Sequence, residues 1–190
     1  MNAVDEVVAA IEAGKLVVIP TDTVYGLACR PDREDAVRAL STLKRRSPEQ
    51  PIALVSSGVD PLLELIPELP GDRLVRGAFT FVVPNPADRL PWLGGTGTIG
   101  VRIPEVTGVT AELLARVGAV AATSANLHGH PDPRRVNEVP AEILGGVVAI
   151  LDVGELPGTP STVLDLTGPD PRILREGAVP AAEALRQVSE

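Results

Sequence analysis

The chain has 190 residues, of which 22% are charged and 44% hydrophobic, so it can bury one well-packed core but not two. Its formal net charge of −8 and its two Phe, one Trp and one Tyr argue against a surface that binds a polyphosphate backbone or stacks bases, and stable RNA binding is not expected. No apolar run approaches the roughly 18 residues of a membrane span, and the acidic start "MNAVDEVVAAIEAG" is unlike a signal peptide, so we expect a cytoplasmic protein with no membrane partner.

The apolar spacing predicts an amphipathic helix over residues 2–13, with Asn2 as its cap and Gly14 as its stop. The continuous apolar run at 16–19 predicts a strand buried on both faces, and residues 32–43 predict a second helix capped by Asp32. In chain order the pattern then predicts strands at 52–55, 79–83 and 98–101, a helix at 110–117, a strand at 119–123, a helix at 137–144, strands at 147–151 and 162–166, and a last helix at 180–188. Strands interleaved with helices indicate a single α/β domain over residues 1–190, with helices covering a sheet.

Polar side chains follow three of the predicted strands at the point where each strand ends. They are Thr21, Thr23 and Tyr25 after the first strand, Arg102 after the strand at 98–101, and Ser124 and Asn126 after the strand at 119–123. Strand ends are where sheet proteins commonly build sites, so we expect these segments to line one crevice. Hydroxyls, an amide and a guanidinium suit a polar, anionic small molecule.

Each of these motifs also has a purely structural interpretation. The hydroxyls of "PTDT" at 20–23 could bond their own backbone in a turn, and the cations of "KRR" at 44–46 could simply favour a helix C-terminus. Arg175 could pair with a neighbouring acid at the surface. The lone Cys29 and two histidines do not make a zinc site, and Cys29 is expected to be a small buried hydrophobe.

Six short motifs occur together in one order along the chain. They are "PTDTVYGL" at 20–27, Lys44-x-Arg46, "TIGVRIP" at 98–104, "SANLHGHP" at 124–131, "STVLDL" at 161–166 and "ILREG" at 173–177. This ordered set resembles the YrdC-like family of threonylcarbamoyl-AMP synthases, and the resemblance spans residues 14–178. It implies a twisted sheet of mixed parallel and antiparallel strands, flanked by helices, with a concave site.

The resemblance implies an enzyme, a nucleotidyltransferase that condenses L-threonine, bicarbonate and ATP to threonylcarbamoyl-AMP and pyrophosphate for the threonylcarbamoyladenosine modification of tRNA. Threonine and bicarbonate form a carbamate, whose oxygen attacks the α-phosphate of ATP. Mg²⁺ is expected to arrive with ATP, because the motifs contain no cluster of carboxylates for a fixed metal site and no Walker-type loop. Other tRNA threonylcarbamoylation proteins would be its partners in such a role.

The resemblance also assigns roles to individual residues. Lys44 and Arg46 are expected to be catalytic, because fixed cations stabilise the charge that adenylation builds on the α-phosphate and on pyrophosphate. The ATP-binding set is Lys44, Arg46, Ser124, Asn126 and Arg175. The threonine-binding set is Thr21, Thr23, Tyr25, Arg102 and Ser161, in which Arg102 would pair with the carboxylate of threonine.

The chain departs from the family pattern at "RGAFT", residues 76–80. Family members usually carry Pro-Gly-Pro, one further residue and Thr before the central strand; here Thr80 remains and both prolines are missing, which would loosen the loop. Two alternatives therefore stay open: a non-catalytic relative that binds nucleotide or RNA, and an enzyme of the same architecture with different chemistry, such as carbamoyl transfer or sugar-phosphate lysis. Some synthases carry a second, C-terminal domain, and any lid is expected here from the core domain or a partner.

Overall fold

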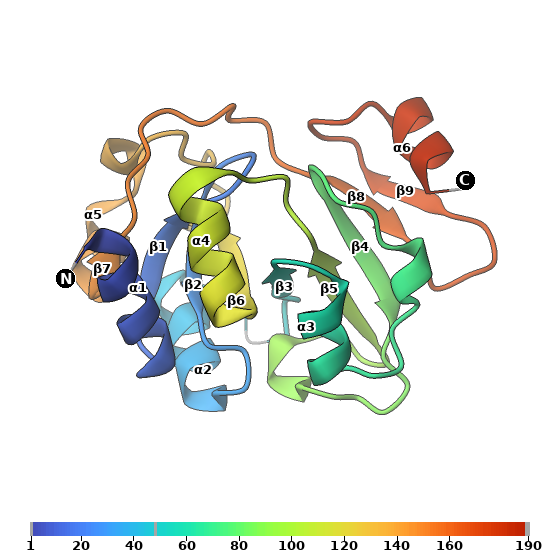
Figure 1. The fold of residues 1–190 in the computed structure, drawn as a ribbon, viewed down its shortest axis with the longest axis horizontal. Coiled ribbons are helices and arrows are strands. Elements are labelled where there is room, and N and C mark those ends of the chain that lie inside the picture. Colours follow the sequence, from blue (N-terminus) through green and yellow to red (C-terminus); the bar gives the residue numbers. More distant parts are fainter. Residues whose placement is uncertain (1, 48, 189–190) are drawn as a thin grey trace.

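The computed structural model describes residues 2–47 and 49–188 as a mixed sheet flanked by helices (Figure 1). The strands are β1 Val17–Pro20, β2 Tyr25–Cys29, β3 Ala53–Ser56, β4 Phe79–Pro84, β5 Thr98–Arg102, β6 Ala119–Ser124, β7 Ala149–Ile150, β8 Thr162–Asp165 and β9 Arg172–Arg175, in the order β7-β1-β2-β6-β3-β5-β4-β8-β9. The pairs β1/β7, β3/β5 and β4/β8 are parallel, and the other neighbours are antiparallel. The expected mixed sheet is confirmed.

Helices and short 3₁₀ turns connect the strands. They are α1 Ala3–Glu12, α2 Glu34–Leu43, α3 Val59–Leu65, α4 Gly108–Val117, α5 Ala141–Gly146 and α6 Ala181–Gln187, with 3₁₀ turns η1 Gly71–Arg73, η2 Pro91–Leu93 and η3 Val136–Glu138. The predicted cap of α1 is confirmed: the Asn2 side chain accepts from the Asp5 amide at 2.9 Å, and the Asp5 carboxylate accepts from the Asn2 amide at 3.0 Å. Gly14, at φ +71°, ends the helix as predicted.

Two details of the predicted helices are wrong. Asp32 does not cap α2, because Arg33 occupies the N-cap position without a side-chain bond and Asp32 is paired with Arg30 at 2.6 Å. The helix expected over 137–144 is two separate pieces, η3 and α5. Pro140 lies between them, and a proline cannot donate the backbone hydrogen bond that a continuous helix needs.

Apart from 3₁₀ turns, two strands and one helix were not expected from the sequence. Strand β2 follows the polar turn directly, and its "YGLAC" stretch lacks the β-branched residues that mark most strands. Helix α3 carries Pro61 in its first turn, where backbone N–H groups have no intrahelical partner and a proline is tolerated. Strand β9, with the sequence "RILR", lies at the edge of the sheet and is mostly exposed, so it shows no buried alternation.

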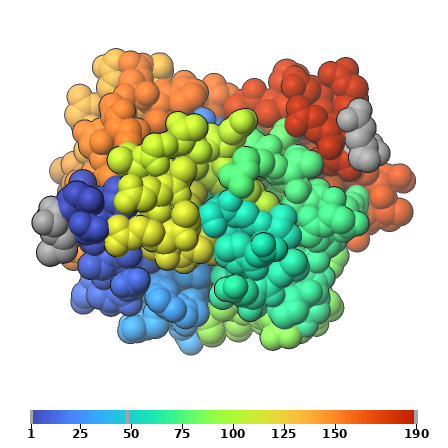
Figure 2. Space-filling model, in the orientation of Figure 1, coloured from blue at the N-terminus to red at the C-terminus, as the bar shows by residue number. Residues whose placement is uncertain are grey.

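The sheet has an apolar core on each face. Helices α1 and α4 lie side by side and pack on residues of β1, β2, β3 and β6. In Figure 2 the yellow-green surface of α4 lies between the dark-blue surface of α1 and the teal surface of α3. The second core, on the opposite face, contains residues of α2, α3, α5 and α6. Side chains therefore alternate between two interiors along each central strand, with Leu27 of β2 in one core and Ala28 in the other.

A long connection from β7 to β8, residues 151–161, crosses the molecule from one end of the sheet to the other (Figure 1, orange). It is fastened on the way, since the Gly158 amide donates to the Thr23 carbonyl at 2.8 Å and the Leu156 amide donates to the Arg134 carbonyl at 2.9 Å. This connection brings Pro160 and Ser161 over the same face of the sheet on which α1 and α4 pack.

Candidate active site

A cavity of about 170 Å³ lies on this face of the sheet, beside the core of α1 and α4. Its lining residues are Thr21, Thr23, Val24, Gly26, Pro51, Ala53, Val55, Thr80, Arg102, Ala122, Thr123, Ser124, Asp132, Pro160, Ser161 and Arg175. Consecutive residues at the end of β6, Ala122, Thr123 and Ser124, all line it. We call it the first cavity.

The first cavity is not formed by strand ends meeting at one edge of the sheet, as the sequence suggested. Arg102 ends β5, but β5 runs antiparallel to β6, which ends at Ser124. The two residues meet because both face the same side of the sheet. Gly26 of β2 also faces this side, and a Cβ atom there would lie 3.4 Å from the Thr123 carbonyl oxygen, so its missing side chain leaves room at the cavity.

The "PTDT" turn both bonds to itself and lines the cavity. Thr21 Oγ1 accepts from the amides of Thr23 and Val24, each at 3.2 Å, and donates to the Val24 carbonyl at 2.8 Å. The Thr21 hydroxyl therefore bonds to the backbone of its own turn, as the structural interpretation of the motif predicts. Thr23 Oγ1 lies 3.0 Å from Thr21 Oγ1 within the turn and also accepts from Arg102 Nη2 at 2.8 Å.

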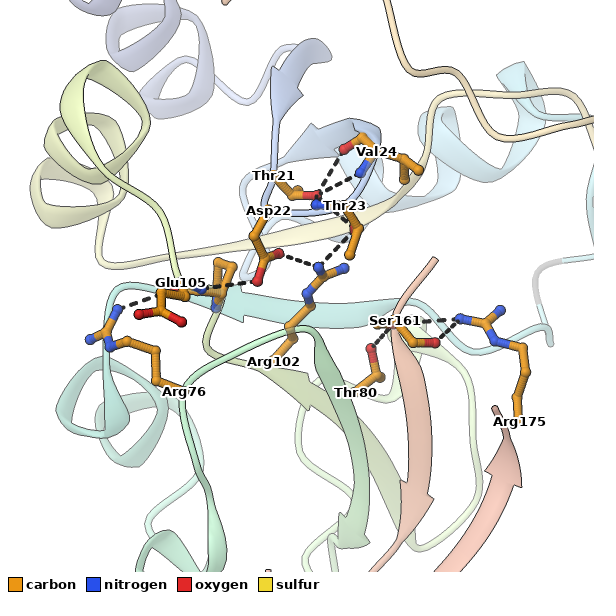
Figure 3. Close-up of polar contacts among 11 residues, drawn as sticks. Thr21, Asp22, Thr23, Val24, Arg76, Thr80, Arg102, Glu105, Ser161 and Arg175 are labelled. Atoms are coloured by element: carbon orange, nitrogen blue, oxygen red, sulfur yellow. Dashed lines mark hydrogen bonds and ion pairs between the residues drawn. The ribbon is translucent and has the colours of Figure 1, made fainter. Parts of the chain in front are cut away.

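Arg102 is held beside the cavity by an ion pair with Asp22 (Figure 3). The same Nη2 atom donates to Asp22 Oδ1, and the other oxygen of Asp22 accepts from the Glu105 amide at 3.0 Å. Burial lowers the pKa of Arg102, and the neighbouring Asp22 carboxylate opposes that shift. Arg102 Nε is buried without a partner among the described residues. The guanidinium is thus fixed on its Asp22 side, and the side chain lines the cavity.

Three further side chains form a second polar group at the cavity, across from the "PTDT" turn (Figure 3). Thr80 Oγ1 and Ser161 Oγ lie 2.8 Å apart, and Arg175 Nη2 donates to the Ser161 carbonyl at 2.8 Å. Arg175 is close enough to Arg102 that its charge also lowers the pKa of Arg102. Two guanidinium groups near one another beside a polar cavity favour an anionic ligand.

A second cavity of about 290 Å³ adjoins the first and shares Pro51, Thr123 and Ser124 with it. Its lining residues are Lys44, Arg46, Gln50, Pro51, Thr123, Ser124, Asn126, His128 and Gly129. The end of β6 therefore belongs to both cavities. The structure brings together Lys44, Arg46, Ser124 and Asn126 here, as the motifs predicted; Arg175 lines the first cavity.

Lys44 is the C-cap of α2, yet it is 3% exposed and extends into the structure. Its Nζ donates to Asn126 Oδ1 at 2.9 Å and to the Ser124 carbonyl. Burial and the positive charge of Arg46 lower the pKa of Lys44 to about 8, against a smaller opposing effect of Asp132. Arg45, next to it, is exposed with φ +54°, so the "KRR" motif divides into a buried lysine and a surface arginine.

Arg46 lines the second cavity and bonds to two of the residues that both cavities share. Its Nη1 donates to Thr123 Oγ1 at 3.1 Å and its Nη2 donates to the Pro51 carbonyl at 2.9 Å. Its Nε is buried without a partner among the described residues, and burial lowers its pKa. The second cavity therefore carries two partly desolvated cations, which are strong partners for phosphate groups.

Tyr25 does not line either cavity, in contrast to its predicted threonine-binding role. In β2 it points to the opposite face from Gly26 and lies fully buried in the core of α2 and α5. Its hydroxyl shares its proton between Asp152 Oδ1 at 2.9 Å and the Gly154 carbonyl at 2.7 Å, and accepts from the Val153 amide at 3.0 Å. Desolvation raises the pKa of Tyr25. The phenol thus fastens the β7–β8 connection.

The segment "RGAFT" is anchored despite its missing prolines. Arg76, drawn in Figure 3, donates through Nη1 to the Pro104 carbonyl at 3.2 Å. Its Nη2 donates to the Ser57 carbonyl at 2.7 Å. The Gly77 amide donates to the Ile103 carbonyl at 2.9 Å. These bonds tie the segment to the end of β5, where Arg102 lies, and hold Thr80 at the cavity.

Polar residues at the cavities that were not among the predicted site residues include Thr80, Thr123 and Asp132, and Asp22 was missed as the partner of Arg102. Asp22 lies inside the recognised motif, so its carboxylate could have been paired with Arg102 from the sequence. Thr80 lies in the strand predicted at 79–83 and Thr123 in the strand predicted at 119–123. The sequence does not show which face of the sheet carries the cavity. Asp132 lies in an irregular loop that no periodicity places.

Neither a metal centre nor a membrane span is found in the part of the chain that the structure describes. Those residues contain no group of three or more His, Cys, Asp or Glu side chains that could hold a metal ion. No helix among them is long and apolar enough to cross a membrane.

Comparison with known proteins gives matches along most of the chain. The family model Sua5_yciO_yrdC, described as "Telomere recombination", matches residues 9–177. A Mycobacterium tuberculosis protein that bears the provisional name threonylcarbamoyl-AMP synthase is 39% identical over 190 residues, which cover 95% of this chain and 86% of that protein. The threonylcarbamoyl-AMP synthase of Pyrococcus abyssi is 35% identical, over 95% of this chain and 55% of the relative.

Comparison with solved structures finds similar folds. The structure of Pyrococcus abyssi Sua5 complexed with L-threonine superposes with a TM-score of 0.88 at 32% identity, covering 98% of this chain and 57% of that one. The present chain thus spans little more than half of the archaeal protein. Escherichia coli YciO superposes with a TM-score of 0.78 at 22% identity, over 96% of this chain and 92% of that one, which bears on the fold alone. The chain belongs to the Sua5/YciO/YrdC family.

Proposed function

We propose that this protein is a threonylcarbamoyl-AMP synthase, a nucleotidyltransferase that uses L-threonine, bicarbonate and ATP. The observation that carries the proposal is the pair of adjoining cavities with one shared wall at the end of β6. The first cavity, at about 170 Å³, is smaller than the roughly 300–1,000 Å³ of pockets for drug-sized ligands and suits a small polar metabolite. The second offers buried cations to phosphates.

In the first cavity the substrate is L-threonine. Arg102, held by Asp22, binds its carboxylate, and the hydroxyls of Thr23 and Ser161 can donate to or accept from its polar groups. The amine and bicarbonate then give a carbamate with loss of water and a proton. The relatives named as synthases and the threonine complex of the Pyrococcus protein support this choice of amino acid.

In the second cavity the ligand is ATP. Ser124 and Asn126 contact the nucleotide, while Lys44 and Arg46 lie near the α-phosphate and the departing pyrophosphate. The carbamate oxygen attacks across the shared wall, and the bond from the α-phosphate to the β-phosphate bridge breaks. Negative charge builds on both phosphate groups, so the two fixed cations stabilise the transition state more than the ground state.

Mg²⁺ would be carried by the phosphates of ATP, where it neutralises part of their charge. The donor set at the second cavity consists of cations, hydroxyls and amides, which fit phosphate oxygens and do not fit a metal ion. The residues of this chain therefore bind and orient the nucleotide. In the cell, the product would be passed to other proteins that modify tRNA.

The test is release of pyrophosphate by the purified protein with ATP, Mg²⁺ and bicarbonate, compared between L-threonine, L-serine and no amino acid. Release that needs both threonine and bicarbonate is the expected result. Nucleotide binding without release under any of these conditions would contradict the proposal and favour a non-catalytic member of the family. Serine differs from threonine by one methyl group, which is worth only about 1–3 kcal/mol of discrimination.

A further inference from the structure

The groups assigned so far leave the amine end of the amino acid without a partner of opposite charge. Arg102 accounts for the carboxylate, and Lys44 and Arg46 account for phosphates. An α-ammonium group entering a cavity lined by two arginines needs an acceptor of opposite charge, because a cation left unpaired in such a site is costly. Among the described residues that line the first cavity, Asp132 is the one with a carboxylate.

The carboxylate of Asp132 is available for a ligand, unlike that of Asp22. Asp22 uses one oxygen for Arg102 and the other for the Glu105 amide. Asp132 is half-buried and makes no hydrogen bond or ion pair with any other residue that the structure describes, although its charge reaches Lys44 and opposes the fall in the pKa of that lysine. Among the described residues, Asp132 is therefore an anion without a partner at the first cavity.

The loop that carries Asp132 is fixed on both sides of it. Before it, the Asn126 side chain donates to the His130 carbonyl, and the His130 amide donates to the Leu127 carbonyl at 3.0 Å. After it, the Pro133 carbonyl accepts from the Tyr25 amide at 2.9 Å. Asp132 stands between two prolines: Pro133 disfavours a helical backbone at Asp132, and Pro131 has its own φ fixed by its ring. The carboxylate is thus presented at the cavity by a constrained segment.

We propose that Asp132 binds the α-ammonium group of the amino-acid substrate. The inference rests on the proposed function, and it makes the first cavity a site for a zwitterion, with Arg102 at the carboxylate and Asp132 at the amine. It also places the amine at the loop that adjoins the second cavity, so the carbamate formed there faces the nucleotide. Asp132 is a binding residue for one end of the substrate and not a metal ligand.

The experiment measures binding of L-threonine to the full chain by calorimetry, for the wild type, Asp132→Asn and the matched control Asp170→Asn. Asp170 is exposed and lines neither cavity. Loss of a charge-assisted hydrogen bond should weaken L-threonine about 10- to 100-fold in Asp132→Asn and leave Asp170→Asn unchanged. The second probe is 2,3-dihydroxybutanoate of threonine stereochemistry, which has a hydroxyl in place of the amine. Asp132→Asn and Asp170→Asn should both bind it with the affinity of the wild type.

ATP binding separates this role from a metal-binding one. Removing the negative charge of Asp132 should leave the dissociation constant of MgATP unchanged or lower, because Lys44 and Arg46 then hold the phosphates without a competing anion. Asp132→Glu should recover part of the threonine affinity. Equal thermal unfolding midpoints for the wild type and both Asp132 variants are expected, since the side chain has no bonds to lose.

Two results would overturn the proposal while leaving the function intact. One is threonine affinity within twofold of wild type in Asp132→Asn, and the other is a selective loss of MgATP affinity in that variant. If the wild type binds no L-threonine and releases no pyrophosphate, the proposed function fails and this inference fails with it. If Asp132→Asn and Asp132→Glu lose as much affinity for 2,3-dihydroxybutanoate as for L-threonine, the side chain has a structural role in its loop. The proposed contact with the ammonium group is then wrong.

Discussion

Asp22 and Arg102 form an ion pair with side chains only 10% and 9% exposed, and they come from the β1–β2 turn and the end of β5. Removing one partner of a buried pair leaves an uncompensated charge, which costs about 3–5 kcal/mol. We therefore expect Asp22→Ala to lower the free energy of unfolding by about that amount, measured by urea denaturation. Threonine affinity should fall as well, because Arg102 loses the bond that orients it.

A double variant tests whether the loss of stability in Asp22→Ala comes from the uncompensated charge of Arg102. Asp22→Ala combined with Arg102→Met removes both charges, so it should be more stable than Asp22→Ala alone and still bind threonine more weakly than the wild type. If the single Asp22 variant unfolds like the wild type, the pair is too well solvated to matter. Its contribution would then be limited to orienting Arg102.

Lys44 and Arg45 allow a matched comparison of a buried and an exposed cation in one motif. Lys44→Ala removes a cation that lines the second cavity, and turnover should fall about 100-fold, as for loss of one electrostatic donor in an active site. Arg45→Ala removes a side chain that contacts Glu142 at 3.5 Å across the surface, and it should retain full turnover. Pyrophosphate release measures both. Equal rates of pyrophosphate release in the two variants would favour the structural interpretation, in which "KRR" only stabilises the C-terminus of α2.

The depressed pKa of Lys44 makes nucleotide binding depend on pH. Lys44 in the free protein carries its charge below a pH of about 8 and loses it above, so ATP affinity should fall as pH rises through that value. In Lys44→Arg the charge stays at all these pH values, and affinity should be flat from pH 7 to about 10. Calorimetric titration with ATP in the absence of threonine isolates the effect. A fall of the same size in the variant would assign the titration to another group.

Tyr25→Phe should affect stability more than ligand binding. The hydroxyl is buried and bonds to Asp152, Val153 and Gly154, which are themselves exposed, so its removal loses these hydrogen bonds at a cost of about 0.5–1.5 kcal/mol each. Threonine and ATP should both bind the folded variant with near wild-type affinity. A selective loss of threonine affinity would restore the role that the sequence motif gave to this phenol.

The motifs predicted a common location for several cations and polar side chains because they occur in a fixed order along the chain. Lys44, Arg46, Ser124 and Asn126 do meet at one cavity. Side-chain direction was harder, because Tyr25 and Gly26 are adjacent in the chain but point to opposite faces of β2, and the sequence does not show that a strand begins there.

Other features of the site could not be predicted because they depend on contacts between distant parts of the chain. The pairing of neighbouring strands decides that Arg102 and Ser124 share a face although their strands run in opposite directions. Such pairings join segments far apart in the chain and leave no local pattern. Asp132 illustrates the limit most clearly, since its place at the cavity depends on bonds that its loop makes to Asn126 and Tyr25.

The free thiol of Cys29 lies at the end of β2 in the interior core, fully buried, and desolvation raises its pKa to about 12. At neutral pH the thiolate is therefore almost absent, and an alkylating reagent cannot reach the sulfur while the sheet is intact. Modification has to wait until β2 and the helices over it separate. Because Cys29 is the one cysteine of the chain, its rate of alkylation reports how often that part of the molecule opens, without any label being introduced.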